Sequence, residues 1–169
     1  MSITLKNKKI VISAGGSGIG WSSAKIFLDK GATVYLCDIN SKFIDRCKKH
    51  NLINRKLFAF HCDASDENQV KNFYNQIIKK TKKIDALINN VGIAGPTGTL
   101  EKLKSKDWED TLKVNVISHF YFSKYAIPML KKNKGGAIIN LSSTAGIFGF
   151  PLRSPYCASK WAVVGMTKT

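Results

Sequence analysis

The sequence KIVISAGGSGIG, which spans residues 9–20, joins a short apolar run to a turn that is rich in glycine. A helical pattern of apolar residues follows, includes Phe27 and Leu28, and stops at Gly31. This order predicts a strand, a tight turn and a helix, and the glycines would let the backbone come close to a ligand. The amides at the start of such a helix suit a pyrophosphate. The strict GxGxxG spacing is absent, because Trp21 stands where the third glycine would fall, so the turn alone is weak evidence.

A second apolar run, residues 33–37, ends on Asp38, which lies eighteen residues after Gly20. An acidic side chain at this distance suits the ribose hydroxyls of a dinucleotide. The alternative is that Asp38 only caps the helix expected from Ser41. That alternative does not account for the spacing from the glycine turn, so the two features together favour a dinucleotide site.

The rest of the chain continues the alternation of strand and helix. The expected strands are 58–62, 84–88 and 137–141, and the expected helices are 67–80 and about 106–131. Pro128 should bend or end the long helix, because proline has no backbone N–H. This period predicts βαβ units, a parallel sheet and helices on both of its faces. We expect residues 1–169 to form a single domain, since no linker or internal repeat interrupts the pattern.

A candidate for the chemistry lies in residues 143–160. Tyr156 and Lys160 are four residues apart at the start of an apolar run that follows Pro155, which suits the first turn of a helix and places both side chains on one face. The ammonium group would favour the phenolate, so that Tyr156 could exchange a proton with an alcohol or a carbonyl. Ser143 could hold the same substrate oxygen, which leaves hydride transfer to a dinucleotide. The alternative is a chance spacing, with Ser143 bonded to backbone.

Composition restricts the other possibilities. The chain has 169 residues, 44% of them hydrophobic, and contains no apolar run of membrane-spanning length or signal-peptide character, so we expect a cytoplasmic protein and no membrane partner. The net charge of +16 could indicate nucleic acid, but 24 lysines and only 3 arginines are scattered over several expected faces, which favours a solvated surface. No cysteine pair has CxxC spacing, and we expect no metal site. The expected buried or half-buried thiols are Cys37, Cys47, Cys62 and Cys157.

With these residues placed, the chain resembles the short-chain dehydrogenase/reductase family along its whole length. The residues that carry the resemblance are the turn at 13–20, Asp38, Asp63, the sequence Asn-Asn-Val-Gly at 89–92, and the set Asn115, Ser143, Tyr156 and Lys160. The resemblance implies an α/β fold, namely a Rossmann-like doubly wound parallel sheet that forms a single NAD(P)-binding domain.

The resemblance also implies roles for four residues in the interconversion of a secondary alcohol and a ketone. Tyr156 would be the acid and base, and Lys160 would assist it and hold the nicotinamide ribose. Ser143 would bind the oxygen of the small-molecule alcohol or ketone. Asn115 would anchor a water of a proton relay.

For the cofactor, the resemblance implies NAD. Gly18, Ile19 and Gly20 would meet the pyrophosphate, Asp38 the adenosine ribose and Asp63 the adenine. The full expected set is Ser13, Gly15, Ser17, Gly18, Ile19, Gly20, Asp38, Ile39, Cys62, Asp63, Asn90, Val91, Gly92, Tyr156 and Lys160. NADP is less expected, because Asp38 would repel a 2′-phosphate, although Lys42 and Arg46 are near enough in sequence to offset part of this repulsion.

A homodimer or homotetramer is expected as well, built on the helix at 106–131 and the helix that starts near Tyr156. The outer faces of these helices are expected to carry Tyr121, Tyr125, Trp161 and Val164.

Three departures from the family pattern have consequences. Ser13-Ala14 replaces the usual Thr-Gly, and a Cβ at position 14 would strain a backbone of positive φ. Val91 replaces alanine at a position expected to pack behind the cofactor turn. The chain stops at Thr169, whereas family members continue through two more strands, so we expect a sheet that lacks its C-terminal strands. The alternative function is therefore a truncated, catalytically inactive remnant that at most binds a nucleotide.

Overall fold

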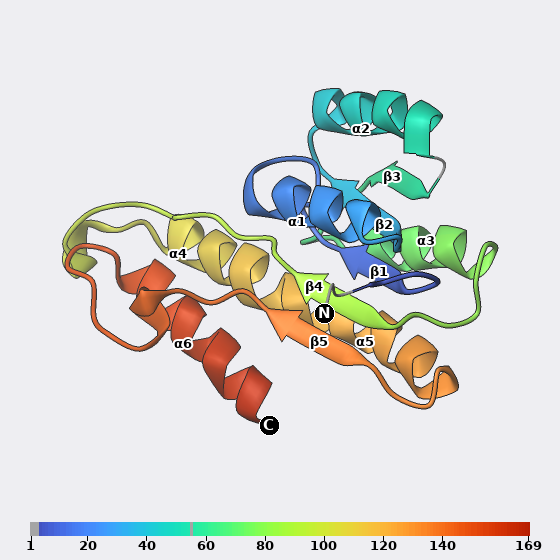
Figure 1. Ribbon diagram of the computed structural model, residues 1–169. Helices are drawn as coiled ribbons and strands as arrows, with labels where there is room; N and C mark the ends of the chain where they lie inside the picture. Colours follow the sequence, from blue (N-terminus) through green and yellow to red (C-terminus); the bar gives the residue numbers. More distant parts are fainter. Residues whose placement is uncertain (1–3, 55) are drawn as a thin grey trace.

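The computed structural model describes residues 4–54 and 56–169, and it contains a five-stranded parallel sheet with the order β3-β2-β1-β4-β5 (Figure 1). The strands are β1 (Lys9–Ile12), β2 (Thr33–Asp38), β3 (Leu57–His61), β4 (Ala86–Asn89) and β5 (Ala137–Asn140). The helices are α1 (Gly18–Asp29), α2 (Ser41–Asn54), α3 (Glu67–Ile78), α4 (Ser105–Leu112), α5 (Ser118–Lys132) and α6 (Ser154–Lys168). All four strand pairs are parallel, as the alternating pattern predicts.

Two hydrophobic cores cover the two faces of the sheet. On one face Ile10 and Ile12 of β1 pack with buried residues of α1 and α2, whereas Val11 points to the opposite face and packs with residues of α3 and α5. Successive side chains of a strand point to opposite faces, so a strand that is apolar throughout needs helices on both sides. The expectation of a doubly wound sheet is confirmed (Figure 1).

The long helix expected at about 106–131 is present as a continuous helical run, with one local difference: α4 and α5 are joined by a π-helical segment, η2 (Lys113–Ile117). Pro128 was expected to bend or end this helix, and it does not end it, since α5 continues to Lys132. Pro128 lies on the exposed side of α5. The next two residues, Met129 and Leu130, are buried and anchor the last turn of the helix to the core.

The outer faces of α5 and α6 also differ from the expectation. Tyr125 donates a hydrogen bond to Glu67 on α3, 3.0 Å away, and together with Tyr121 it packs against the core, so these two rings belong partly to the protein's own packing. Trp161 on α6 is 52% exposed, whereas Val164 is half-buried. In the part of the chain that the structure describes, no helix is long and apolar enough to cross a membrane.

Candidate active site

The glycine turn is tied to the loop after β4 by side-chain hydrogen bonds. The Ser13 hydroxyl accepts from the backbone N–H of Asn90 at 3.0 Å and of Val91 at 3.2 Å. The Asn90 amide donates back to the carbonyl oxygens of Ala14 at 2.8 Å and Ser13 at 3.2 Å. Because β1 and β4 are neighbours, these bonds join the carboxyl ends of two adjacent strands. Ser13 and Asn90 thus fix the turn against the loop after β4.

The backbone of the turn leaves no room for side chains at Gly15, Gly16 and Gly20, whereas a Cβ on Gly18 would meet nothing within 4 Å. A Cβ on Gly20 would lie 2.5 Å from the Ala14 carbonyl oxygen, and one on Gly15 would lie 2.7 Å from the Leu36 Cβ. Ala14 has a φ of 49°, so the strain expected for a Cβ at this position is present. The close packing brings the start of α1 directly against the strand end.

The start of α1 can receive an anion. Among the residues that the structure describes, no side chain caps this helix and no acidic residue stands in its first turn. Gly18 and Ile19 are exposed there. Free amides at a helix N-terminus attract phosphate groups, so this end of α1 could hold a pyrophosphate.

A cleft of about 250 Å³ lies next to the turn, at the carboxyl edge of the sheet. Its lining includes seven of the expected cofactor residues: Ser17, Asp38, Ile39, Cys62, Asp63, Val91 and Gly92. Val91 was expected both behind the turn and in the cofactor site, and it is partly buried against the core and also lines the cleft. The structure therefore brings together, at one cavity, expected cofactor residues that follow β1, β2 and β3 and expected cofactor residues that follow β4.

Asp38 is held by backbone amides and does not cap α2. One carboxylate oxygen accepts from the N–H of Gly16 and the other from the N–H of Asn40, both at 3.0 Å, and the side chain is 7% exposed. The start of α2 is capped instead by the Asn40 side chain, which accepts from the N–H of Lys42 at 3.0 Å. The capping alternative for Asp38 is thus wrong, and its carboxylate faces the cleft.

Arg46 lies beside the same turn, and its side chain contacts the backbone of the turn and two aromatic rings. Its guanidinium group donates to the carbonyl oxygen of Gly16 and lies 5.5 Å from the Trp21 ring centroid and 5.2 Å from that of Phe43. These contacts hold the guanidinium group at the carbonyl oxygen of Gly16, the residue whose N–H donates to the Asp38 carboxylate.

Ser143 and Tyr156 meet at a second cavity, of about 220 Å³, beyond the end of β5. Ser143 begins the 3₁₀ turn η3 (Thr144–Gly146), and its hydroxyl accepts from the N–H of Ala145 at 3.2 Å. Tyr156 lies in the first turn of α6, and Pro155 is at a position where a missing N–H is harmless. The two hydroxyl-bearing side chains thus face one space from a strand end and a helix start.

Lys160 is buried beside Tyr156. Its side chain is 5% exposed, Nζ donates to the carbonyl oxygen of Leu141 at 2.9 Å, and Nζ lies 5.8 Å from the centroid of the Tyr156 ring. Burial lowers the pKa of Lys160, because an ammonium group loses solvation in the interior. The expected neighbourhood of the two residues, four apart on one helix face, is confirmed.

Asn115 is fully buried and fully hydrogen-bonded through its amide group. Its Nδ2 donates to the Ile93 carbonyl oxygen and to the Ser159 hydroxyl, both at 2.9 Å, and its Oδ1 accepts from the Ile93 N–H at 2.7 Å. A buried amide requires such partners. Asn115 therefore joins η2, the loop after β4 and α6.

His119 was not singled out by the sequence analysis, although it lies four residues after Asn115 and so on the same helix face. It is completely buried, and its Nε2 lies 3.0 Å from the carbonyl oxygen of Val91 in the cleft wall. Burial lowers the pKa of His119 to about 4, and the charge of Lys160 acts in the same direction. The signal in the sequence that could have identified His119 is its position among the apolar residues of the expected helix, where a polar ring needs a buried partner.

The thiols are buried or half-buried as expected. Burial raises the pKa of Cys47 to about 11 and raises that of Cys37 well above its ordinary value, which disfavours the reactive thiolate.

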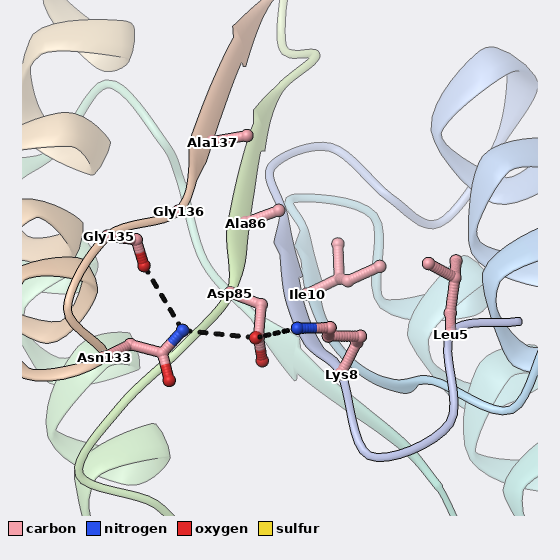
Figure 2. A pocket seen from close by; sticks show the side chains of 9 residues that line it. All are labelled: Leu5, Lys8, Ile10, Asp85, Ala86, Asn133, Gly135, Gly136 and Ala137. Carbon is pink, nitrogen blue, oxygen red and sulfur yellow. Dashed lines mark hydrogen bonds and ion pairs between the residues drawn. The ribbon is translucent and has the colours of Figure 1, made fainter.

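A larger cavity lies at the opposite edge of the sheet (Figure 2). It has a volume of about 440 Å³ and borders the amino ends of β1, β4 and β5. Its polar groups bind one another: Asp85 accepts from Lys8 Nζ at 3.0 Å and from Asn133 Nδ2 at 3.2 Å. Parallel sheets bind ligands at the carboxyl ends of their strands, so we place the site there and not in the larger cavity.

A parallel sheet of this order, with a glycine turn after its central strand, is a Rossmann-like fold. The family model described as short chain dehydrogenase matches residues 8–169, and the chain therefore belongs to the short-chain dehydrogenase family.

Three known proteins illustrate the similarity. The 3-oxoacyl-[acyl-carrier-protein] reductase of Thermotoga maritima is 34% identical over 166 residues, which are 98% of this chain and 67% of the relative. A short chain dehydrogenase/reductase from Burkholderia phymatum, solved in complex with NAD, matches 99% of this chain and 60% of its own with a TM-score of 0.92 and 27% identity. A structure of ElxO with NADP bound matches 95% of this chain and 65% of its own with a TM-score of 0.87 and 31% identity. The chain thus spans about two thirds, or less, of the length of these proteins.

Proposed function

We propose that the protein is an NAD(H)-dependent oxidoreductase that interconverts a secondary alcohol and a ketone. The observation that carries the proposal is the cavity shared by Ser143 and Tyr156, beside which Lys160 is buried. Membership of a family whose relatives are named as dehydrogenases and reductases supports it. A cleft suited to a dinucleotide lies at the same edge of the sheet.

In this proposal the nicotinamide supplies or accepts the hydride, and the protein moves the proton. For ketone reduction, the Tyr156 hydroxyl donates its proton to the substrate oxygen, and for alcohol oxidation the phenolate accepts it. The Ser143 hydroxyl holds that oxygen in place. The Lys160 ammonium group, one helical turn away, stabilises the phenolate.

We propose NAD rather than NADP as the cofactor because of Asp38. Two like charges a few ångström apart repel by about 1 to 4 kcal/mol, so a 2′-phosphate beside this carboxylate is disfavoured. Arg46 would offset part of this repulsion, because its guanidinium group is held at the Gly16 carbonyl oxygen beside the same turn.

The experiment is to titrate the protein with NADH and with NADPH, and then to assay NAD-dependent turnover with a panel of secondary alcohols. We expect NADH to bind at least about fivefold more tightly, as the lower end of the repulsion implies. Equal or tighter binding of NADPH would refute the cofactor assignment. Binding without turnover of any alcohol would favour the alternative, a catalytically inactive protein that binds a nucleotide.

We also propose that the protein forms a homodimer or homotetramer through α5 and α6. Phe120 is 49% exposed and Trp161 is 52% exposed, and aromatic residues are enriched in such interfaces. A two-fold axis would place the same patch of each copy in contact. Sedimentation at micromolar concentration tests this proposal, and a monomer would refute it.

A further inference from the structure

Among the described residues, the ring of His119 has one hydrogen-bond partner, the carbonyl oxygen of Val91, at 3.0 Å. A carbonyl oxygen only accepts, so the ring must carry its hydrogen on Nε2. The other ring nitrogen, Nδ1, is buried without a partner among the described residues. A protonated ring would place a second N–H in that unpaired position, and burial together with the positive charge of Lys160 lowers the pKa of His119 to about 4.

The backbone of Val91 is held from two sides. Its N–H donates to the Ser13 hydroxyl at the end of β1, 3.2 Å away, and its carbonyl oxygen accepts from His119 on α5. Val91 and Gly92 line the cleft expected to hold the dinucleotide. The hydrogen bond of His119 therefore acts on the cleft wall itself.

The other end of this wall is held by Asn115, one helical turn before His119. The Asn115 amide bonds both the N–H and the carbonyl oxygen of Ile93. Gly92 lies between the two held residues, and a Cβ on it would be 3.4 Å from Lys160 Nζ and 3.4 Å from Asn115 Oδ1. Residues 91–93 thus separate the cleft from the buried lysine.

We propose that His119 is a positioning residue that clamps residues 91–93 together with Asn115, and thereby sets both the width of the cofactor cleft and the place of Lys160. The proposal rests on the proposed function, because it concerns the dinucleotide cleft. An apolar side chain of similar size would fill the same volume but leave the Val91 carbonyl oxygen unpaired in the interior, which a buried backbone group does not tolerate well.

The experiment compares His119→Leu, which removes the donor, with His119→Gln, whose amide N–H can reach the place of Nε2. Amide hydrogen exchange at Val91, Gly92 and Ile93 is measured without nucleotide, and the dissociation constant for NADH is measured separately. We expect His119→Leu to raise both the exchange rates and the dissociation constant about tenfold, the factor that corresponds to one lost hydrogen bond. His119→Gln should recover most of both.

Phe122→Leu is the matched control, because Phe122 is equally buried in α5 but packs toward α3. It should destabilise the core and leave both measurements near those of the unmodified protein. If His119→Leu does not fold, His119→Asn replaces it, since its shorter amide cannot reach Val91.

Unchanged exchange in His119→Leu, or a glutamine variant no better than the variant without a donor, would overturn the clamp. Absence of NADH binding by the unmodified protein would count against the proposed function instead, while the exchange rates would still decide the clamp.

Discussion

Two regions meet at the carboxyl edge of the sheet, and they are built in different ways. The glycine turn follows β1, the central strand, where Val11, Ile12 and Ser13 are completely buried. The region of Tyr156 follows β5, an edge strand on which Ile139 is 50% exposed. The first region is thus part of the core, and the second lies at its border.

The difference lies in what holds each region. The turn is held by the side-chain hydrogen bonds of Ser13 and Asn90 and by close backbone packing, which leaves no room for a Cβ at Gly20. The region of Tyr156 is anchored by side chains that join α6 to the end of β5: Lys160 Nζ donates to the Leu141 carbonyl oxygen, and the Ser142 hydroxyl donates to the Lys160 carbonyl oxygen, each at 2.9 Å. Changes in the turn should therefore damage folding and binding together, whereas changes at Tyr156 should stop the chemistry alone.

The largest effect is expected from Tyr156→Phe. The ring remains in place beside Lys160, but the proton donor is lost, and positioned acid and base groups contribute about 10² to 10⁴ in rate. We expect kcat to fall about a thousandfold, with the dissociation constant for NADH and the free energy of unfolding nearly unchanged.

Tyr125→Phe is the control, because it removes a phenol hydroxyl that bonds Glu67 outside the site. This variant should keep the kcat of the unmodified protein. A Tyr156→Phe variant that retained a tenth or more of the activity would remove the phenol from the mechanism.

His119 connects the two regions, and its effect should depend on pH. Its folded-state pKa of about 4 lies below the ordinary value of 6.5, so between these two pH values the unfolded chain binds a proton that the folded protein excludes. The free energy of unfolding should thus fall by as much as roughly 3 kcal/mol as the pH drops from about 6.5 to about 4, and stay level above this range. The positive charge of Lys160, on α6, acts on His119 in the same direction as burial.

Urea unfolding at pH 7 and at pH 4.5 tests this expectation. The His119→Gln variant has no titrating ring and should lose less stability on acidification than the unmodified protein. Parallel pH profiles for the two proteins would contradict the assignment.

Gly20→Ala should break the first region. The new Cβ would lie 2.5 Å from the Ala14 carbonyl oxygen and 2.6 Å from Asn90 Nδ2, so the turn must move away from the loop after β4. We expect the free energy of unfolding to fall by about 1 to 3 kcal/mol, as for overpacked cores, and NADH to bind correspondingly more weakly. Thermal unfolding and NADH titration measure the two effects.

Gly149→Ala serves as the counterpart in the second region, since a Cβ there has open space around it. It should leave both quantities nearly unchanged. If the two variants behaved alike, the distinction between a turn held in part by close backbone packing and a region anchored by side chains would be wrong.

Local patterns in the sequence were sufficient to predict the sheet, the glycine turn and the helix that carries Tyr156 and Lys160. Each of these depends on neighbours in the chain: apolar runs, glycines and a spacing of four residues. The segment η2 was not predictable in this way, because Asn115 is held by Ile93 and Ser159, which are 22 and 44 residues away. The same holds for His119, whose partner Val91 is 28 residues away.

The smallest effect is expected from Ala14→Gly, where sequence and structure agree on a strained position. Ala14 has a φ of 49°, and an L-residue in this conformation loses about 1 to 2 kcal/mol relative to glycine. Glycine also gains freedom in the unfolded chain, which offsets about 0.4 to 1 kcal/mol. The two terms leave a net stabilisation of about 0.5 kcal/mol, measurable as a small rise in the urea midpoint, with NADH binding preserved because the Asn90 bond is to the Ala14 backbone.

Gly165→Ala is the mirror control in α6, since a Cβ on this glycine meets nothing within 4 Å and its φ is that of a helix. There the side chain should stabilise the protein by about 0.5 to 1 kcal/mol, because glycine is a poor helix former. Opposite substitutions are thus expected to stabilise the two regions, Cβ removal in the turn and Cβ addition in the helix. A destabilised Ala14→Gly variant would mean that the positive φ at position 14 carries no strain, and that the turn tolerates a side chain there as well as it tolerates glycine.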